Sequence, residues 1–219
     1  MTTQAIIFDF GNVLDFYEEL EAWNTRRDAL AAQFNLSGKK MWDVFYQGAP
    51  WQEVKKGRIS YPEFWDRTLT PLGMTDPAAQ ADFVARLFEG RVQIHPSMEA
   101  LLRELKPHYR LAILSNTYEV EMETWLVETF GLVDIFNAVV SSAKVGLAKP
   151  EPEIYQLTLD MLGIAPDEAL FIDDLPRNTK AAEALGIPSI IFESPAQLRH
   201  ELQERGILPT NQPILYNHQ

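Results

Sequence analysis

Charged and hydroxyl side chains follow the short apolar runs of this sequence, at the points where buried strands should end. The apolar runs 5–8, 111–114, 138–140 and 170–172 are followed respectively by Asp9, by Ser115 and Asn116, by Lys149, and by Asp173 and Asp174. Each of these residues alone is commonly a turn former, a helix cap or a solvated charge. Ligands of open α/β sheets, however, bind beyond the carboxyl ends of the strands. Four polar sets at successive strand ends therefore indicate a single site.

Phosphoryl transfer is the chemistry that these residue types support. Two or three carboxylates suit Mg²⁺, which takes oxygen ligands and keeps several waters. A carboxylate held by that metal can attack phosphorus and form an aspartyl-phosphate, which water then hydrolyses. A serine hydroxyl, backbone N–H groups and a lysine ammonium can hold the other phosphate oxygens as charge redistributes.

Alternating strand and helix patterns should position these residues in one parallel sheet. After Ile94 the apolar strand runs alternate with helical spacing, which predicts helices over about 96–106, 118–130, 154–162 and 178–185 and a last strand over 189–192. Repeated βα units of this kind imply an α/β fold with helices on both faces of the sheet. The tail after Leu208 is polar, and we expect it to be loosely held.

A stretch of about 80 residues interrupts this series after its first strand, and it is too long for a structureless loop. Its apolar and aromatic residues recur at helical spacing, and Ser60 with Glu63 has capping-box spacing. We therefore expect residues 16–94 to form an α-helical cap, and residues 1–15 with 95–219 to form the catalytic core. Trp42, Trp51 and Trp65 are candidates for the substrate-facing surface, although core packing is the commoner role of a tryptophan.

The sequence resembles the haloacid dehalogenase-like hydrolase superfamily along nearly its whole length. The resemblance is carried, in order, by Phe8-Asp9-Phe10-Gly11-Asn12-Val13-Leu14, Leu114-Ser115-Asn116, Lys149-Pro150-Glu151-Pro152-Glu153-Ile154-Tyr155 and Phe171-Ile172-Asp173-Asp174-Leu175-Pro176-Arg177-Asn178. It implies a Rossmann-like parallel sheet flanked by helices, with the first strand central and a helical cap inserted after it. Residues 11–14 and 56–60 look most similar to the branch that contains bacterial glucose-1-phosphate phosphatases and the phosphatase domain of soluble epoxide hydrolases.

The resemblance also implies a role for each site residue. The catalytic residues would be Asp9 as nucleophile, Ser115 and Lys149. The Mg²⁺ ligands would be Asp9, the carbonyl of Gly11 and Asp174, with Asp173 beside them. The substrate phosphate would be held by Gly11, Asn12, Ser115, Asn116 and Lys149, and Asn178 would orient its neighbours from behind.

Gly11 is the one departure from the phosphatase pattern that matters for the chemistry. Phosphatases of the family usually carry a second aspartate two residues after the nucleophile, where it protonates the leaving group and then activates water. Loss of such acid–base help typically costs roughly 100- to 10,000-fold in rate. Asp15 and Glu18 are replacement candidates only because they are close in sequence.

Three functions remain open on this evidence. The first and favoured one is a Mg²⁺-dependent phosphatase of a small phosphorylated metabolite, for which a sugar phosphate is one candidate. The second is a metal-free 2-haloacid dehalogenase that also uses Asp9, although adjacent carboxylates at Asp173 and Asp174 would repel an anionic substrate. The third is a weakly active binding protein on the same fold, and Gly11 is its support.

Composition excludes several other classes of function. The net charge of −12 and the lack of any basic run argue against nucleic acid as a partner. The chain has no cysteine, which excludes disulfides, thiolate metal sites and cysteine nucleophiles. There is no signal-peptide pattern and no apolar run of about 18 residues, so we expect a cytoplasmic protein without a membrane partner. The oligomeric state is left open.

Overall fold

A five-stranded parallel sheet forms the centre of the larger part of the molecule. The computed structural model describes residues 2–15, 20–89, 94–132 and 134–209. The strand order is β3-β2-β1-β4-β5, and the strands are β1 (Ala5–Phe8), β2 (Arg110–Ser115), β3 (Ala138–Ser141), β4 (Ala169–Asp173) and β5 (Ser189–Ile191). The expected α/β fold with a central first strand is therefore confirmed. Every residue of β1 is buried, as its uninterrupted apolar run requires.

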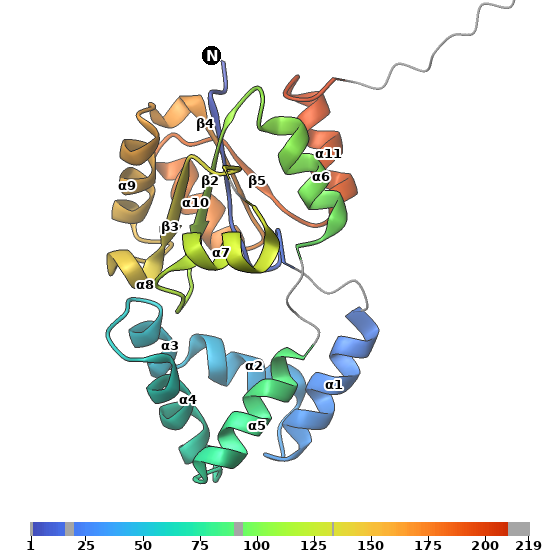
Figure 1. Ribbon diagram of the computed structural model, residues 1–219, viewed down its shortest axis with the longest axis vertical. Coiled ribbons are helices and arrows are strands. Elements are labelled where there is room, and N and C mark those ends of the chain that lie inside the picture. Colours follow the sequence, from blue (N-terminus) through green and yellow to red (C-terminus); the bar gives the residue numbers. More distant parts are fainter. Residues whose placement is uncertain (1, 16–19, 90–93, 133, 210–219) are drawn as a thin grey trace, which may run out of the picture.

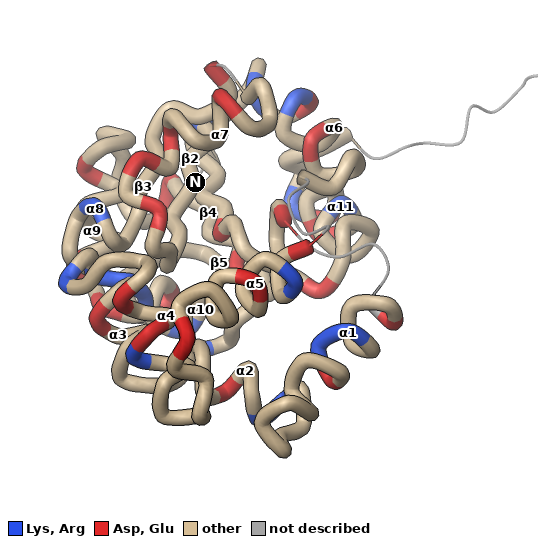
Figure 2. Tube along the Cα trace, turned by 60° about the horizontal axis from the view of Figure 1, so that its bottom comes forward, with Lys and Arg blue, Asp and Glu red and all other residues tan. Residues whose placement is uncertain are grey.

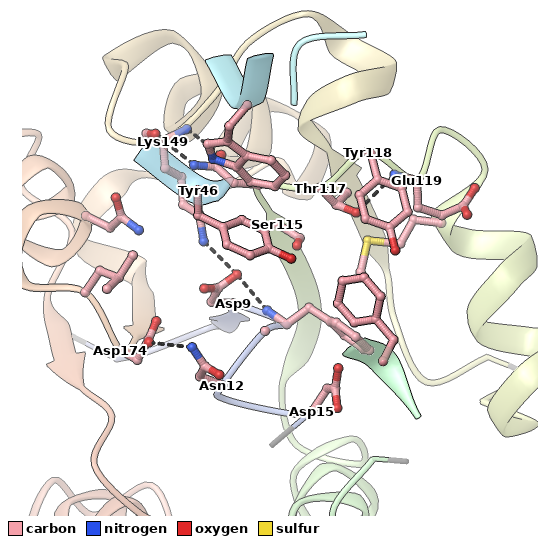
Figure 3. A pocket seen from close by; sticks show the side chains of 18 of the residues that line it. Asp9, Asn12, Asp15, Tyr46, Ser115, Thr117, Tyr118, Glu119, Lys149 and Asp174 are labelled. Carbon is pink, nitrogen blue, oxygen red and sulfur yellow. Dashed lines mark hydrogen bonds and ion pairs between the residues drawn. The ribbon is translucent and has the colours of Figure 1, made fainter. Parts of the chain in front are cut away.

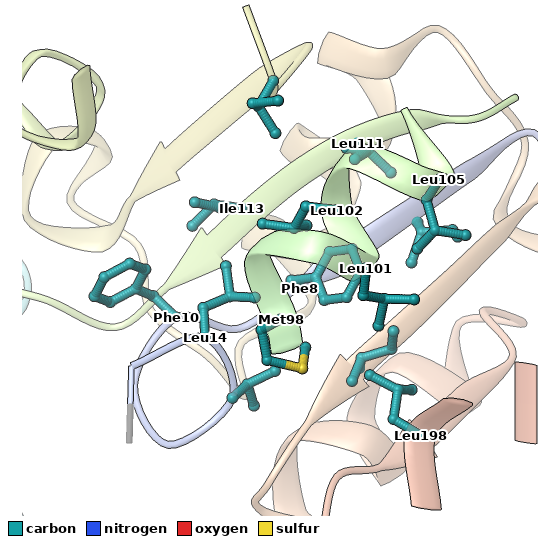
Figure 4. Close-up of a cluster of buried hydrophobic side chains, with 14 of the residues drawn as sticks. Phe8, Phe10, Leu14, Met98, Leu101, Leu102, Leu105, Leu111, Ile113 and Leu198 are labelled. Carbon is teal, nitrogen blue, oxygen red and sulfur yellow. The ribbon is translucent and has the colours of Figure 1, made fainter. Parts of the chain in front are cut away.

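Helices cover both faces of this sheet. Side chains alternate across a strand, so Ile6 and Phe8 point to one face while Ala5 and Ile7 point to the other. The first face packs against α6 (Pro96–Leu105), α7 (Met122–Phe130) and α11 (Pro195–Glu204) (Figure 4). The second face packs against α9 (Pro152–Leu162) and α10 (Pro176–Ala184). Two short elements, α8 (Ser142–Val145) and a 3₁₀ turn over Pro166–Glu168, lie in the connections.

A separate helical unit, here called the cap (residues 20–89), lies beyond the carboxyl ends of the strands (Figure 1). It consists of α1 (Leu20–Ala32), α2 (Gly38–Gln47), α3 (Ala49–Val54), α4 (Tyr61–Leu69), a 3₁₀ turn over Thr70–Leu72, and α5 (Pro77–Phe88). The cap has its own apolar core, to which Met41, Phe45 and Phe83 contribute fully buried side chains. Figure 2 shows acidic positions spread over the helices of both parts, in line with the net charge of −12. None of the helices among the described residues has the length and apolarity needed to cross a bilayer.

Local side-chain hydrogen bonds explain where several helices begin. The Ser60 hydroxyl accepts the N–H of Glu63, as its spacing predicts. The expected helix at residue 118 instead begins at Met122, because the Thr117 hydroxyl and the Glu119 carboxylate accept backbone N–H groups in the preceding turn.

Three helices, α3, α8 and α11, were not predicted from the sequence. Phe16, Glu18 and most of the tail lie outside the described residues.

Residues 56–61 of the cap contact the loops and the short helix α8 at the carboxyl ends of the core strands. Lys56 of the cap is paired with Glu151 of the core, and the ring of Tyr61 stacks on Tyr118 with centroids 4.1 Å apart. Gly57 also lies close against the core: a Cβ built there would lie 2.3 Å from the carbonyl oxygen of Ala143. Gly57 also has φ +66°, a conformation that favours glycine. Residues 56–61 thus hold the cap against the loop ends of the core.

Candidate active site

A cavity of about 630 Å³ lies between the strand ends and the cap (Figure 3). The structure brings together eight of the nine site residues predicted from the sequence along its wall: Asp9, Gly11, Asn12, Ser115, Asn116, Lys149, Asp174 and Asn178. The ninth, Asp173, is fully buried behind them. A cavity of this size is typical of small-molecule sites.

Lys149 connects the two parts of this constellation. Its ammonium lies 2.8 Å from Asp9 Oδ1 and 2.7 Å from Asp173 Oδ2. The Asn116 side chain positions the backbone of Lys149, since its amide donates to the Lys149 carbonyl at 2.9 Å and its oxygen accepts the Lys149 N–H at 2.8 Å. Asn116 thus positions the backbone of Lys149, and it also lines the cavity, where a phosphate contact was expected.

Asp173 is held by donors on every side. Asn178 Nδ2 donates to both of its carboxylate oxygens at 2.9 and 3.0 Å, and the backbone N–H of Leu175 donates at 2.9 Å. Tyr155 in turn donates to the Asn178 carbonyl at 3.0 Å. With Lys149 added, Asp173 is a fixed counter-charge for the lysine. Because both of its carboxylate oxygens already accept hydrogen bonds from these donors, Asp173 is a poorer direct ligand for a cation than Asp9 or Asp174.

Asp9 follows β1 and Asp174 follows β4, and their carboxylates lie close together at the ends of these neighbouring strands. Asp9 accepts the N–H of Phe10 and the Lys149 ammonium through the same oxygen, Oδ1. Among the described residues this leaves Oδ2 as the oxygen available to a substrate or a cation. Asp174 accepts from Asn12 Nδ2 at 3.1 Å, and the φ of 61° at Asn12 turns the chain so that this contact can form.

The donor set fits a hard divalent cation. Asp9, Asp173 and Asp174 each offer an oxygen, and these oxygens lie within 4.8 Å of one another. Lys149 pairs with Asp9 and Asp173, and Asp174 adds a third carboxylate beside them, so a divalent cation would offset an excess of negative charge. Oxygen donors at a site open to solvent are what Mg²⁺ prefers.

Burial dominates the electrostatics of these groups. It raises the pKa of the Asp9 carboxyl to about 7, and the neighbouring Asp173 adds to this effect while Lys149 opposes it. Burial also raises the pKa of Asp174, against the hydrogen bond from Asn12. For Lys149 burial alone would lower the pKa, but the Asp9 and Asp173 carboxylates together raise it. Lys149 is thus firmly charged, while Asp9 and Asp174 gain from any cation bound between them.

Gly11 leaves open the position where a proton donor would lie. A Cβ built on Gly11 has no neighbour within 4 Å, and its φ lies outside the left-handed region. The glycine is therefore not required by the backbone. Asp15, one of the two replacement candidates, does line the cavity, whereas Glu18 lies outside the described residues.

Much of the cavity wall was not predicted from the sequence, and one of the three candidate tryptophans lies outside the cavity. Trp42 and Trp51 line the cavity as predicted, but Trp65 does not: it is 4% exposed and packs inside the cap against Phe45, with ring centroids 5.2 Å apart. Unpredicted lining residues include Tyr46, Tyr61, Phe88, Tyr118, Trp125 and Arg177. Helical spacing alone cannot distinguish the face turned to the cap's own core from the face turned to the cavity.

Comparison with known proteins gives one consistent family. A family model described as haloacid dehalogenase-like hydrolase matches residues 3–186. Rat Bifunctional epoxide hydrolase 2 is 38% identical over 196 residues, which is 84% of this chain and 34% of that protein. The chain covers 39% or less of the length of the first two curated relatives it matches.

Two solved structures have a similar fold over most of this chain. A HAD family enzyme from Bacteroides thetaiotaomicron, solved in complex with magnesium and inorganic phosphate, has 27% identity and a TM-score of 0.68, covering 90% of this chain and 98% of its own. The L-2-haloacid dehalogenase from Xanthobacter autotrophicus, with chloropropionic acid covalently bound, also has 27% identity, with a TM-score of 0.63 and coverage of 95% and 85%.

Proposed function

This chain belongs to the haloacid dehalogenase-like hydrolase family, and from that premise we propose that it is a Mg²⁺-dependent phosphatase of a small phosphorylated metabolite, with Asp9 as the nucleophile. The observation that carries the proposal is the pairing of a buried, ion-paired Asp9 with a second carboxylate, Asp174, at the floor of a substrate-sized cavity. The 38% identity to rat Bifunctional epoxide hydrolase 2 supports placing the chain in the branch that includes the phosphatase domain of soluble epoxide hydrolases.

The positions of the side chains suggest how the ester is held. Lys149 is fixed beside Asp9, where its ammonium can contact a phosphate oxygen while it orients the carboxylate. Ser115, 4% exposed at the end of β2, presents its hydroxyl to the same cavity. These donors are fixed by the fold before the substrate arrives, which is the condition for effective electrostatic stabilisation of the developing charge.

In the first half-reaction a carboxylate oxygen of Asp9 attacks phosphorus and the P–O bond to the leaving alcohol breaks. The second half-reaction is attack of water on the resulting acyl phosphate, which returns the Asp9 carboxylate and releases inorganic phosphate. When bound between Asp9 and Asp174, Mg²⁺ would supply charge neutralisation for the two anions that must meet. The Gly11 carbonyl is the third ligand that we propose, and Asn12 orients Asp174 for this role.

The dehalogenase alternative also has a structural neighbour, the Xanthobacter enzyme. That chemistry needs no cation, however, and the cluster of three carboxylates around one lysine would repel a haloacid in the absence of one. The solved complex of a similar enzyme with magnesium and inorganic phosphate supports the phosphatase instead.

One assay separates these functions. We expect phosphate release from an aryl phosphate that requires Mg²⁺ and is lost with EDTA, and no halide release from a 2-haloacid. Asp9→Asn should abolish turnover. Asp167→Asn should not alter it, because Asp167 is exposed and lies before the start of β4, at the opposite end of the sheet from the cavity. Equal activity in EDTA, or halide release as fast as phosphate release, would refute the proposal; a correctly folded protein inactive on every ester would leave the binding-protein alternative.

A further inference from the structure

Among the described residues, the wall that the cap (residues 20–89) contributes to the cavity carries no charged side chain. It is made of the aromatic residues Trp42, Tyr46, Trp51, Tyr61 and Phe88, together with Val84 and Ala85, and its one amide is Gln47. From this wall we infer that the leaving group of the substrate is an apolar cyclic or branched alcohol and not a sugar. This inference rests on the proposed phosphatase function and names its substrate class.

The aromatic wall is rigid because its rings contact one another and the cap core. The ring centroids of Trp42 and Tyr46 lie 4.4 Å apart, and those of Tyr46 and Trp51 lie 5.0 Å apart. Trp51 continues the series to the fully buried Phe64 at 6.0 Å. A preformed apolar surface binds an apolar group without the cost of ordering side chains.

The core contributes aromatic rings to the same cavity, beside polar residues such as Thr117 and Glu119. Tyr118 stacks on Tyr61, and Trp125 packs edge-on against Phe10 with centroids 5.4 Å apart. Figure 3 shows Tyr46 and Tyr118 in the same cavity as Asp9 and Ser115. The phosphate group would therefore lie at the polar floor while the organic group lies between aromatic rings of the cap and of the core.

The polar groups of the cavity do not suit a sugar or a second anion. A sugar would leave several hydroxyls against aromatic faces, and a buried hydroxyl without a partner is costly. Apart from Asp9, Asp174 and Lys149, the described residues that line the cavity include two acidic side chains, Asp15 and Glu119, and one basic side chain, Arg177, and this net negative charge disfavours a second phosphate or carboxylate. One phosphate on an otherwise apolar body is the chemistry that this cavity complements.

Two matched esters test the inference. Cyclohexylmethyl phosphate and glucose 6-phosphate are both primary alkyl phosphates on a six-membered ring, and they differ in the ring oxygen and the hydroxyls. With Mg²⁺ present we expect kcat/KM for cyclohexylmethyl phosphate to be at least about tenfold higher, the discrimination that apolar pockets commonly achieve. Isothermal titration calorimetry of each ester with the Asp9→Asn variant should give a lower dissociation constant for cyclohexylmethyl phosphate than for glucose 6-phosphate.

A pair of variants assigns the preference to the cap wall. Trp51→Gln places an amide in the wall and should reduce the ratio between the two esters by about tenfold, mainly through KM for the apolar one. Phe34→Gln changes another half-buried cap aromatic, which packs on Phe83 outside the cavity, and should leave the ratio unchanged.

The outcomes distinguish this inference from the proposed function. If an aryl phosphate is hydrolysed with Mg²⁺ but glucose 6-phosphate is used as well as the cyclohexylmethyl ester, the substrate class is wrong and the phosphatase stands. If no ester is hydrolysed, the phosphatase is wrong, and the calorimetric ratio alone decides whether the cavity prefers an apolar phosphate. Equal binding of the two esters would overturn the inference in either case.

Discussion

The ammonium of Lys149 lies 2.8 Å from Asp9 Oδ1, and the two side chains are 1% and 12% exposed. Because Lys149 is buried away from water, its ammonium keeps the ion pair with Asp9, and this ion pair fixes the orientation of the Asp9 carboxylate. The same ammonium reaches Asp173 at 2.7 Å, which fixes the lysine from its other side. The nucleophile is thus oriented by a chain of contacts that runs back through Asp173 to Asn178.

Lys149→Met should lower both activity and stability. The substitution keeps the length of the side chain but leaves two buried carboxylates facing one another, and breaking a buried pair costs roughly 3–5 kcal/mol in the free energy of unfolding. Urea unfolding measures this loss. Lys144→Met, which removes an exposed pair with Glu121, should cost less than about 1 kcal/mol. Similar losses in the two variants would contradict the orienting role of Lys149.

Mg²⁺ should stabilise the folded protein through Asp174. Binding to the folded state alone raises the free energy of unfolding by about 2.7 kcal/mol at a hundredfold excess of ligand over Kd. Thermal unfolding should show a Tm that rises with Mg²⁺ in the wild type and in Asp167→Asn. The rise should vanish in Asp174→Asn; a variant that keeps it would remove Asp174 from the cation site.

Gly11→Asp should fold normally and hydrolyse alkyl phosphates faster. The position has open space around its Cβ and needs no left-handed backbone, so neither a clash at Cβ nor the backbone opposes a side chain there. A positioned acid–base group is worth at least about 100-fold where the leaving alcohol requires a proton. Gly11→Asn is the matched control, because its side chain has the same shape and cannot titrate. An equal gain in both variants would show that the effect is not proton transfer.

Lys55→Met should stabilise the protein near neutral pH. Lys55 is 8% exposed, and its burial, assisted by the nearby Arg177, lowers its pKa from 10.5. Removing such a charge should gain on the order of 1 kcal/mol. As pH rises through the lowered pKa toward 10.5 the unfolded chain holds more protons than the folded one, so wild-type stability increases and the advantage of the variant shrinks.

Urea unfolding near pH 7 and near pH 10 checks both statements about Lys55. Lys56→Met is the control, since Lys56 is paired with Glu151 and its loss should bring no gain. A Lys55→Met advantage that is constant with pH would show that the gain comes from packing and not from the charge.

The sequence predicted the elements whose signal is local. β1, β2 and β4 are buried on both faces, so they appear as uninterrupted apolar runs, and the polar residues that follow them are the site. The helix α11 was missed because only Leu198 and Leu202 of it are buried, so its apolar stripe is too short to stand out among polar residues. The helix α3 was missed because Gly48 and Pro50 look like a turn, whereas they begin a helix.

The parts of the site that were not predicted depend on tertiary packing. Trp51 and Trp65 are both cap tryptophans, yet Trp51 lines the cavity and Trp65 packs against Phe45 inside the cap. Which face of a cap helix turns to the core is decided by contacts such as that of Gly57 with Ala143, far apart in sequence. In the same way, the carboxylate of Asp173 is recognisable in the sequence, but its occupation by Lys149 and Asn178 is not.

The central position of β1 has a consequence for how the chain folds as it is synthesised. Ala5 pairs with Arg110 on one side and with Ala169 on the other, so β1, the first of these strands to be synthesised, has no neighbour until the cap and α6 have been made, and it gains its second neighbour only with β4. The apolar core of the cap, in contrast, draws on side chains from Trp23 to Phe88, apart from Tyr118 of the core, and can begin to form in the meantime. Long-range pairing of this kind is slow, and an unpaired apolar strand is prone to aggregation. The nucleophile is therefore among the first residues of the site to be made and among the last to be placed.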